Sequence, residues 1–163
     1  VDHLDEEIAG TTTYAADTRR NTGLVIGWSG RFSAHRLQVD LRHDDNSAYG
    51  GVTTGKLGWA MDLTQTVTVR AVAGTAFRAP SFNELYYPNY GAPVDPERST
   101  SVEAGLRWKD GDTSAGLTVY RNRVRDLIGY EPSPAACGDA VYYSFGCAAN
   151  IGRARLQGAT LDT

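Results

Sequence analysis

Two cysteines and one short acidic run are the residues of this chain best suited to covalent or metal chemistry. Cys137 and Cys147 are the only cysteines, so a zinc site would need ligands of other types. Asp44, Asp45 and Asn46 are consecutive and carry oxygen ligands of the kind calcium prefers, without the register of an EF-hand loop. Because Asp and Asn also favour turns, we expect a polar turn here, with Asp44 and Asp45 as weak calcium candidates.

No combination of side chains in the sequence indicates catalysis. His3, His35 and His43 have no recognisable nucleophile partner, and the adjacent His43 and Asp44 do not form a triad. A serine-hydrolase elbow, a phosphate-binding loop and a dinucleotide-binding glycine motif are all missing. The formal net charge of -3 lacks the basic field on which non-specific nucleic-acid binding relies. We predict neither an enzyme nor a nucleic-acid-binding protein, and no cofactor.

Tyrosines are the main candidates for ligand contact. A tyrosine offers an apolar ring and a polar tip at low entropic cost, so tyrosines clustered on loops favour a ligand-binding surface. The alternative is an aromatic girdle combined with ordinary loop packing. Seven of the nine tyrosines fall in segments that have the composition of long connections: Tyr49, Tyr86, Tyr87, Tyr90, Tyr130, Tyr142 and Tyr143.

The elements that must position these residues are strands. Apolar residues recur at every second position, which is the period of a strand and not of a helix. Two weaker stretches, at 4–13 and 150–163, extend the pattern to the ends of the chain. The sequence therefore predicts an all-β fold, an antiparallel meander of about eight strands. The six clear strands contain residues 24–28, 37–41, 57–61, 67–73, 102–108 and 115–119.

The connections between these strands alternate between short and long. Short turns are expected at 30–32, 62–64 and 110–111, and long connections near 43–51, 78–99 and 127–149. Trp28, Trp59 and Trp108 all lie on the apolar face, each within a few residues of a short turn. Such a ring of amphipathic aromatics is typical of a membrane–water interface. We therefore assign the apolar face to lipid; a soluble β-sandwich or small-barrel binding module, with the tryptophans buried, is the alternative.

Four segments together resemble one family. The segment 74–86, GTAFRAPSFNELY, is similar to the signature of TonB-dependent outer-membrane receptors, in which a strand rises into a surface loop. DPERS at 95–99, with EAGL at 103–106, resembles the point where that loop enters the next strand. YRN at 120–122 with DLI at 126–128, and NIG at 150–152, follow in the family's order. Residues 20–23 and 44–50 are most similar to the cobalamin (vitamin B12) receptors.

The resemblance implies a transmembrane β-barrel of the plugged type, with roughly 22 strands. Residues 1–163 would be one fragment of the barrel domain, lacking the plug and the terminal strands. The intact protein would bind and import cobalamin across the Gram-negative outer membrane, driven by the TonB complex acting on the absent plug. An iron–siderophore or haem receptor of the same family is the alternative. Loop residues expected to bind the ligand are Tyr86, Tyr87 and Tyr90, followed by Asn83 and Tyr130.

This location also implies chemistry for the cysteines and for a row of arginines. An outer-membrane protein passes through the oxidising periplasm, so we expect a disulfide between Cys137 and Cys147. Calcium would be a cofactor only in the intact receptor. Outer-membrane lipid and lipopolysaccharide are expected partners, since Arg121, Arg123 and Arg125 continue the outward face and guanidinium groups bind phosphates bidentately. Alternatively, the strand bulges there and places these arginines in solvent.

Overall fold

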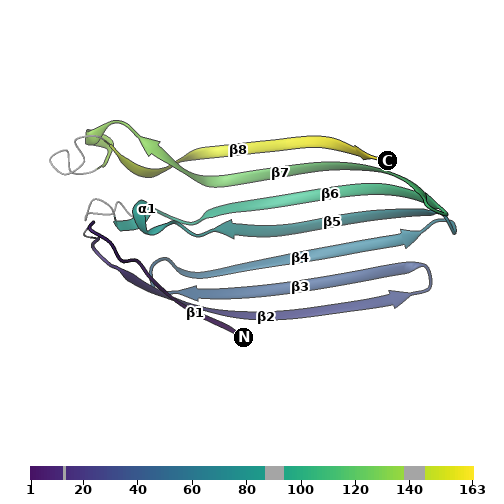
Figure 1. Ribbon diagram of the computed structural model, residues 1–163, viewed down its shortest axis with the longest axis horizontal. Coiled ribbons are helices and arrows are strands. Elements are labelled where there is room, and N and C mark those ends of the chain that lie inside the picture. The colour runs from purple at the N-terminus through teal and green to yellow at the C-terminus, as the bar shows by residue number, and fades with distance from the viewer. Residues whose placement is uncertain (13, 87–93, 138–145) are drawn as a thin grey trace.

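The computed structural model describes residues 1–12, 14–86, 94–137 and 146–163. They form one curved sheet of eight strands, in the order β1 to β8, with every neighbouring pair antiparallel (Figure 1). This arrangement confirms the predicted all-β meander. The elements are β1 (Asp2–Glu7), β2 (Thr18–Phe32), β3 (His35–Asn46), β4 (Gly50–Asp62), β5 (Val67–Arg78), α1 (Phe82–Tyr86), β6 (Glu97–Asp110), β7 (Thr113–Glu131), the 3-10 helix η1 (Pro134–Cys137) and β8 (Cys147–Asp162).

Short turns lie together at one end of the sheet, on the right in Figure 1. Ser33 and Ala34 join β2 to β3, and Gly111 and Asp112 join β6 to β7. Gly111 has a φ of 59°, the left-handed conformation that two-residue hairpin turns require and that glycine adopts without strain. The opposite end of the sheet carries α1 and the described residues of the longer connections, and we call it the loop end; these residues are 8–12, 14–17, 79–86, 94–96, 132–137 and 146.

Three predicted boundaries at the loop end are wrong. The connection expected near 127–149 begins only after Glu131, the last residue of β7. The connection expected near 43–51 is a three-residue turn, because β3 continues through Asn46 and β4 begins at Gly50. Asp44, Asp45 and Asn46 are therefore strand residues and not a polar turn. The first strand, expected over 4–13, ends at Glu7. The polarity of residues 44–46 favours a turn in isolation, but Asp44 and Asn46 find hydrogen-bond partners on the neighbouring strand β2.

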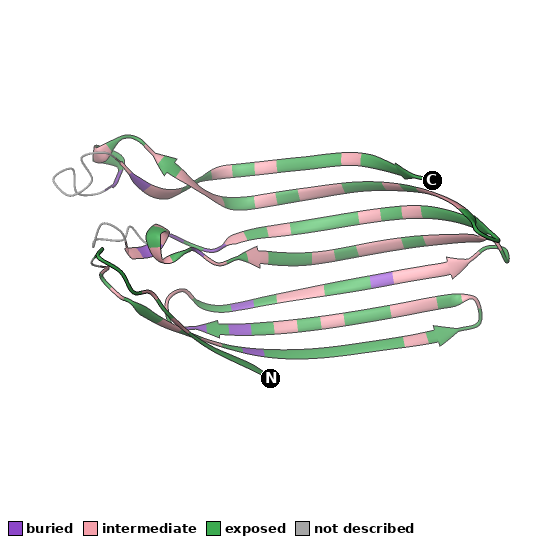
Figure 2. Cartoon of the chain, in the orientation of Figure 1, coloured by how far each residue is buried: buried purple, intermediate pink, exposed green. Residues whose placement is uncertain are grey.

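One face of the sheet is apolar from strand to strand, and none of the described elements forms a second layer against it. The buried hydrophobic side chains of the described residues are few and scattered, and large apolar side chains along the sheet are exposed (Figure 2). Trp28 is 50% exposed and Trp108 is 38% exposed, which contradicts the alternative of a β-sandwich with buried tryptophans. A contiguous apolar face of this size requires lipid or another cover. Directly opposed pairs on it are Ile26 with Leu41, Val39 with Leu57, and Leu106 with Leu117.

The other face of the sheet is polar, and many of its charges are paired. Arg36 donates two hydrogen bonds of 2.8 Å to the carboxylate of Asp62. Arg70 lies 3.2 Å from Glu103 on the adjacent strand. The two faces of the sheet therefore differ in polarity, as the alternation of side chains along each strand requires. Among the residues described, no helix is long and apolar enough to span a membrane.

Candidate functional site

The loop end is held together by a guanidinium that bridges two carboxylates. Arg78, the last residue of β5, donates hydrogen bonds of 3.1 and 3.0 Å to both oxygens of Glu84 in α1. It also donates one of 2.8 Å to Glu97, the first residue of β6. The same Glu97 oxygen accepts the backbone N–H of Ile128 in β7 at 3.0 Å. One cluster therefore joins β5, α1, β6 and β7.

Helix α1 begins with a reciprocal pair of hydrogen bonds. The Ser81 hydroxyl accepts the backbone N–H of Glu84 at 3.3 Å, and the Glu84 carboxylate accepts the backbone N–H of Ser81 at 2.6 Å. This is a capping box, which allows a helix of a single turn to form. Burial of Glu84 raises the pKa of its carboxyl, but hydrogen bonds from Arg78 and Ser81 more than offset this and leave the pKa below its usual value.

A second anchor fastens the segment that follows residues 87–93. The Asn150 side chain of β8 accepts the backbone N–H of Asp95 at 2.9 Å and donates to the Asp95 carbonyl at 3.0 Å. Asn150 also donates to the carbonyl of Asp126 at 2.7 Å. Asp126 has a φ of 56° and stands at a bulge where the register between β7 and β8 shifts. Asn150 therefore joins the β5–β6 connection to the bulge in β7.

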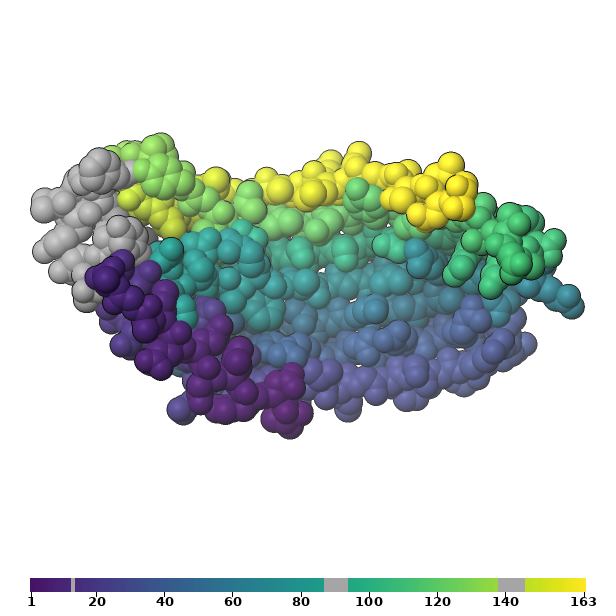
Figure 3. Space-filling model, in the orientation of Figure 1, coloured from purple at the N-terminus to yellow at the C-terminus, as the bar shows by residue number. Residues whose placement is uncertain are grey.

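The N-terminal part of the chain is fastened to the same end. Arg19 of β2 pairs with Glu6 of β1, donates to the carbonyl of Pro80 at 2.6 Å, and lies 4.9 Å from the ring centroid of Phe82. The hydroxyl of Tyr14 donates to the Asn83 side chain at 2.7 Å. In Figure 3 the purple N-terminal segment accordingly meets the teal residues around α1.

Three of the predicted ligand-binding residues are described, and all three lie at this end in different settings. Tyr86 is half-buried, with its ring 6.0 Å from that of Phe82. Asn83 is exposed, and Tyr130, near the end of β7, is 62% exposed. No hydrogen bond or ring contact joins Tyr86 to Tyr130 in the described part of the chain. Tyr87, Tyr90, Tyr142 and Tyr143 lie outside the described residues.

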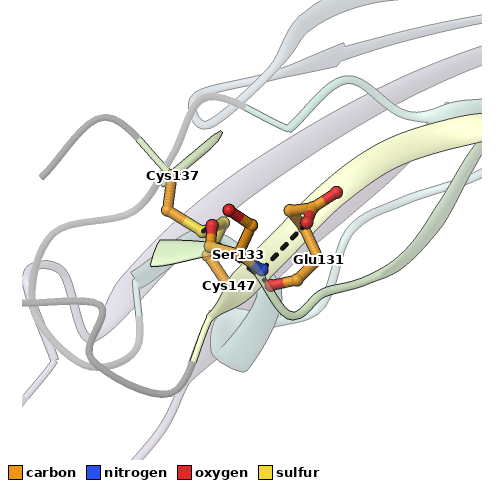
Figure 4. Close-up of a disulfide and its surroundings, with 4 residues drawn as sticks. All are labelled: Glu131, Ser133, Cys137 and Cys147. Atoms are coloured by element: carbon orange, nitrogen blue, oxygen red, sulfur yellow. Dashed lines mark hydrogen bonds between the residues drawn. A yellow bond between two sulfur atoms is a disulfide. The ribbon is translucent and has the colours of Figure 1, made fainter. Parts of the chain in front are cut away.

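The expected disulfide is present at the loop end. Cys137 of η1 is bonded to Cys147, the first residue of β8, with 5.9 Å between the two Cα atoms. Both cysteines are buried, and the carbonyl of Ser133 lies 3.4 Å from the Cys137 sulfur (Figure 4). The backbone N–H of Ser133 donates to the Glu131 carboxylate at 2.9 Å, which fixes the chain as it leaves β7 (Figure 4).

The two calcium candidates do not converge. Asp44 and Asp45 are adjacent in a strand, so their side chains project from opposite faces of the sheet. Asp44 is 1% exposed, and its oxygens accept two hydrogen bonds of 2.6 Å from Arg42 and one of 2.9 Å from Asn21. The Arg42 guanidinium therefore already balances the charge of Asp44. No group of three or more potential metal ligands occurs among the described residues.

Sequence reasoning missed the residues that hold the loop end in place. Arg78, Glu97 and Asn150 each lie in one of the four motifs, but their partners are distant in the sequence. Arg78 and Glu97 are 19 positions apart, and Asn150 is 55 positions from Asp95. The capping box was the one local signal, because Ser81 and Glu84 have the required spacing. Tryptophans Trp28, Trp59 and Trp108 do lie near the short turns on the apolar face, as expected; their role at a membrane interface stays a prediction.

Known proteins resemble this chain over nearly its whole length. The vitamin B12 transporter BtuB of Photobacterium profundum is 34% identical over 151 residues, covering 92% of this chain and 24% of that protein. The BtuB of Vibrio vulnificus is 31% identical over 157 residues, covering 94% of this chain and 24% of that protein. The chain thus spans about a quarter of the length of these curated relatives.

Solved structures share the fold at lower identity. The siderophore receptor PirA from Pseudomonas aeruginosa matches with a TM-score of 0.76 and 23% identity, covering 89% of this chain and 28% of that one. A ferric enterobactin receptor (PfeA) mutant from the same species, in complex with enterobactin, matches with a TM-score of 0.76 and 21% identity, covering 88% and 24%.

A family model described as TonB dependent receptor-like, beta-barrel, matches residues 3–163. Together with the eight-stranded meander and the four motifs that anchor its loop end, this match confirms the resemblance found in the sequence. The chain belongs to the TonB-dependent receptor β-barrels, a family of Gram-negative outer-membrane transport proteins and not of enzymes.

Proposed function

We propose that this chain is part of an outer-membrane receptor that binds and imports cobalamin. The observation that carries the proposal is the 34% identity, over 92% of the chain, to a protein named as a vitamin B12 transporter. The siderophore receptors among the solved structures are less similar in sequence and support only the fold. Transport would draw on the TonB complex acting through a plug, and calcium would be a cofactor of the intact receptor only.

In this proposal, the residues of the loop end bind and position a bulky ligand without a covalent step. Cobalamin combines a broad macrocycle with amide groups at its edge, so a binding surface needs apolar rings together with amide and hydroxyl groups. Tyr86, Asn83 and Tyr130 supply these groups among the described residues, and Tyr87 and Tyr90 are further candidates. The cluster of Arg78, Glu84 and Glu97 orders α1 in advance, which reduces the entropy lost on binding.

Calorimetry on the intact receptor in detergent tests the ligand. We expect cyanocobalamin to bind tightly with calcium present, and a panel of ferric siderophores not to bind. Tight binding of a siderophore without binding of cyanocobalamin would contradict the proposal and leave the family unchanged. Repeating the cobalamin titration after chelation of calcium tests the cofactor, because a loss of affinity is expected only if calcium orders the loops.

Substitutions at the loop end test which residues make the contacts. Combined replacement of Tyr86, Tyr87 and Tyr90 by alanine should weaken cobalamin binding by about tenfold or more, since buried aromatic contacts are typical hot spots. Phe32→Ala is the matched control, because Phe32 is an exposed aromatic residue at the opposite, short-turn end. A loss of less than about twofold in the triple variant would exclude these tyrosines as the main contacts.

A further inference from the structure

The outward face of β7 changes from apolar to cationic along its length. Leu117 and Val119 are exposed and oppose apolar residues on both neighbouring strands. Arg121, Arg123 and Arg125 then occupy the next three positions of the same face. The bulge in β7 begins only after Arg125, so the alternation is intact through these arginines. They therefore lie on the lipid-side face just beyond the apolar band, toward the loop end. Of the two alternatives that the sequence left open, this is the one in which the arginines continue the outward face.

Sheet pairing gathers more arginines around them. Arg123 lies directly opposite Arg155 of β8, and Arg125 lies between Arg153 of β8 and Arg98 of β6. We call these five residues the arginine cluster; all five are exposed. Residues opposite one another across strands are about 5 Å apart at Cα, and residues two apart in a strand about 7 Å. Five positive charges therefore share a small area of one face.

The described residues supply no counterion to these charges. In the part of the chain that the structure describes, no member of the arginine cluster forms an ion pair or a side-chain hydrogen bond, whereas Arg36, Arg42 and Arg78 each contact a carboxylate. Both strands that flank β7 are described, so no unseen strand neighbour supplies an acidic partner to Arg123 or Arg125. Like charges directly opposite one another destabilise a sheet, and an external anion would relieve this repulsion.

The surface of the cluster is shaped to receive such an anion. Arg123, Arg125, Arg153 and Arg155 line a groove of about 750 Å³ together with Thr100. This volume is in the range of small-ligand sites. Guanidinium groups bind phosphate oxygens bidentately, and several of them around one groove can share two or more phosphates. Next to the cluster, Arg121 adds a further positive charge to the same face of β7, although it does not line the groove.

We propose that the arginine cluster binds the phosphate groups of the lipopolysaccharide headgroup in the outer leaflet. The apolar band that begins at Val119 and Leu117 lies directly beside the cluster and would contact the acyl chains of the same molecule. A free phosphate ion would use the arginines alone, whereas an amphiphile with phosphates at its head and hydrocarbon below matches both surfaces. The site lies on the outward face and is independent of the transported ligand.

Lipid binding to the intact receptor tests this proposal. Native mass spectrometry in detergent would measure binding of diphosphoryl lipid A to the natural protein and to a variant in which Arg123, Arg125, Arg153 and Arg155 are glutamine. We expect the variant to bind about tenfold more weakly or worse, because each lost contact is a charged hydrogen bond. Binding to the natural protein should also weaken as salt rises.

A control variant removes the same number of charges elsewhere on the sheet and should bind lipid A as the natural protein does. Its substitutions are Arg31→Gln, Lys56→Gln, Arg107→Gln and Lys109→Gln, which lie on the polar face or near the short turns.

Two further binding measurements use only the natural protein, so the proposal is testable even if the glutamine variant does not fold. Dephosphorylated lipid A should bind far more weakly than the diphosphoryl form; equal binding would overturn the proposal. Inorganic phosphate should not displace lipid A at comparable concentration; if it does, the site takes the free anion and the assignment to a lipid is wrong. Unchanged binding by a folded glutamine variant would also overturn it.

Discussion

Replacement of Arg78 by glutamine is expected to loosen α1 while the sheet stays folded. The change removes three charged hydrogen bonds of 2.8–3.1 Å and leaves Glu84 and Glu97 without their shared partner. The Arg78 side chain is 46% exposed, so solvent screens its attraction, but the carboxylates are only 22% and 13% exposed. Leaving such carboxylates unpaired costs about 1–3 kcal/mol. We expect a cost in the lower half of this range, because solvent screens the partly exposed Arg78 side chain.

Amide hydrogen exchange on the intact receptor measures this change. A cost of about 1–3 kcal/mol corresponds to roughly a 5- to 150-fold rise in opening of the α1 segment. The backbone N–H of Leu85, bonded to the Ser81 carbonyl at 3.1 Å, reports on the helix, and that of Ile128 reports on Glu97. Arg31→Gln is the matched control, since the side chain of Arg31 makes one ion pair among the described residues, of 3.5 Å to Asp62.

The expected pattern is faster exchange in α1 for Arg78→Gln only, with amides in the middle of the strands unchanged in both variants. Unchanged protection of Leu85 in Arg78→Gln would refute the reasoning, because the cluster would then contribute nothing to the order of α1. Equal acceleration in Arg31→Gln would refute it as well, by showing a general effect of lost charge.

Three further predictions concern pH, the disulfide and the tryptophans. The pKa of Glu84 lies below its usual 4.5 in the folded chain, so the stabilisation from its ionised form is complete above that pH and is lost as the pH falls through the lowered value. Amide exchange of α1, corrected for intrinsic rates, should therefore rise below about pH 4.5. The same rise should be missing in Glu84→Gln. Replacing Cys137 and Cys147 by serine should lower the local stability of η1 by about 2–3 kcal/mol, measured by exchange of its amides; unchanged exchange would show that other contacts hold it. In reconstituted receptors that retain only Trp28 or Trp108, lipids brominated near the headgroup should quench tryptophan fluorescence more than lipids brominated deep in the acyl chain. If neither lipid quenches the fluorescence, the assignment of these tryptophans to the membrane interface is wrong.

Strands were predictable because their signal is local. Alternation at every second residue fixes which side chains share a face, and in long strands the pattern repeats often enough to exclude a helix. The placement of Trp28 and Trp108 near short turns followed from the same alternation. The pairing of Cys137 with Cys147 was expected from the compartment and not from geometry, and the structure confirms it.

Contacts between distant residues were not predictable, because they depend on register. Asp44 and Asn46 have the composition of a turn, and only their partners on β2 show why the strand continues through them. The arginine cluster appears once β8 is aligned with β7, since Arg153 and Arg155 are far in sequence from the residues they oppose. Glu97 likewise acquires its role through a partner on another strand.

Uptake by living cells tests the proposed function most directly. Cells that lack their own cobalamin receptor would express the intact receptor that contains this chain, with and without a functional TonB protein, and would be given labelled cyanocobalamin. The predicted result is saturable uptake that requires TonB and is not reduced by excess ferric enterobactin. No uptake of cyanocobalamin, together with TonB-dependent uptake of a ferric siderophore by the same cells, would contradict it.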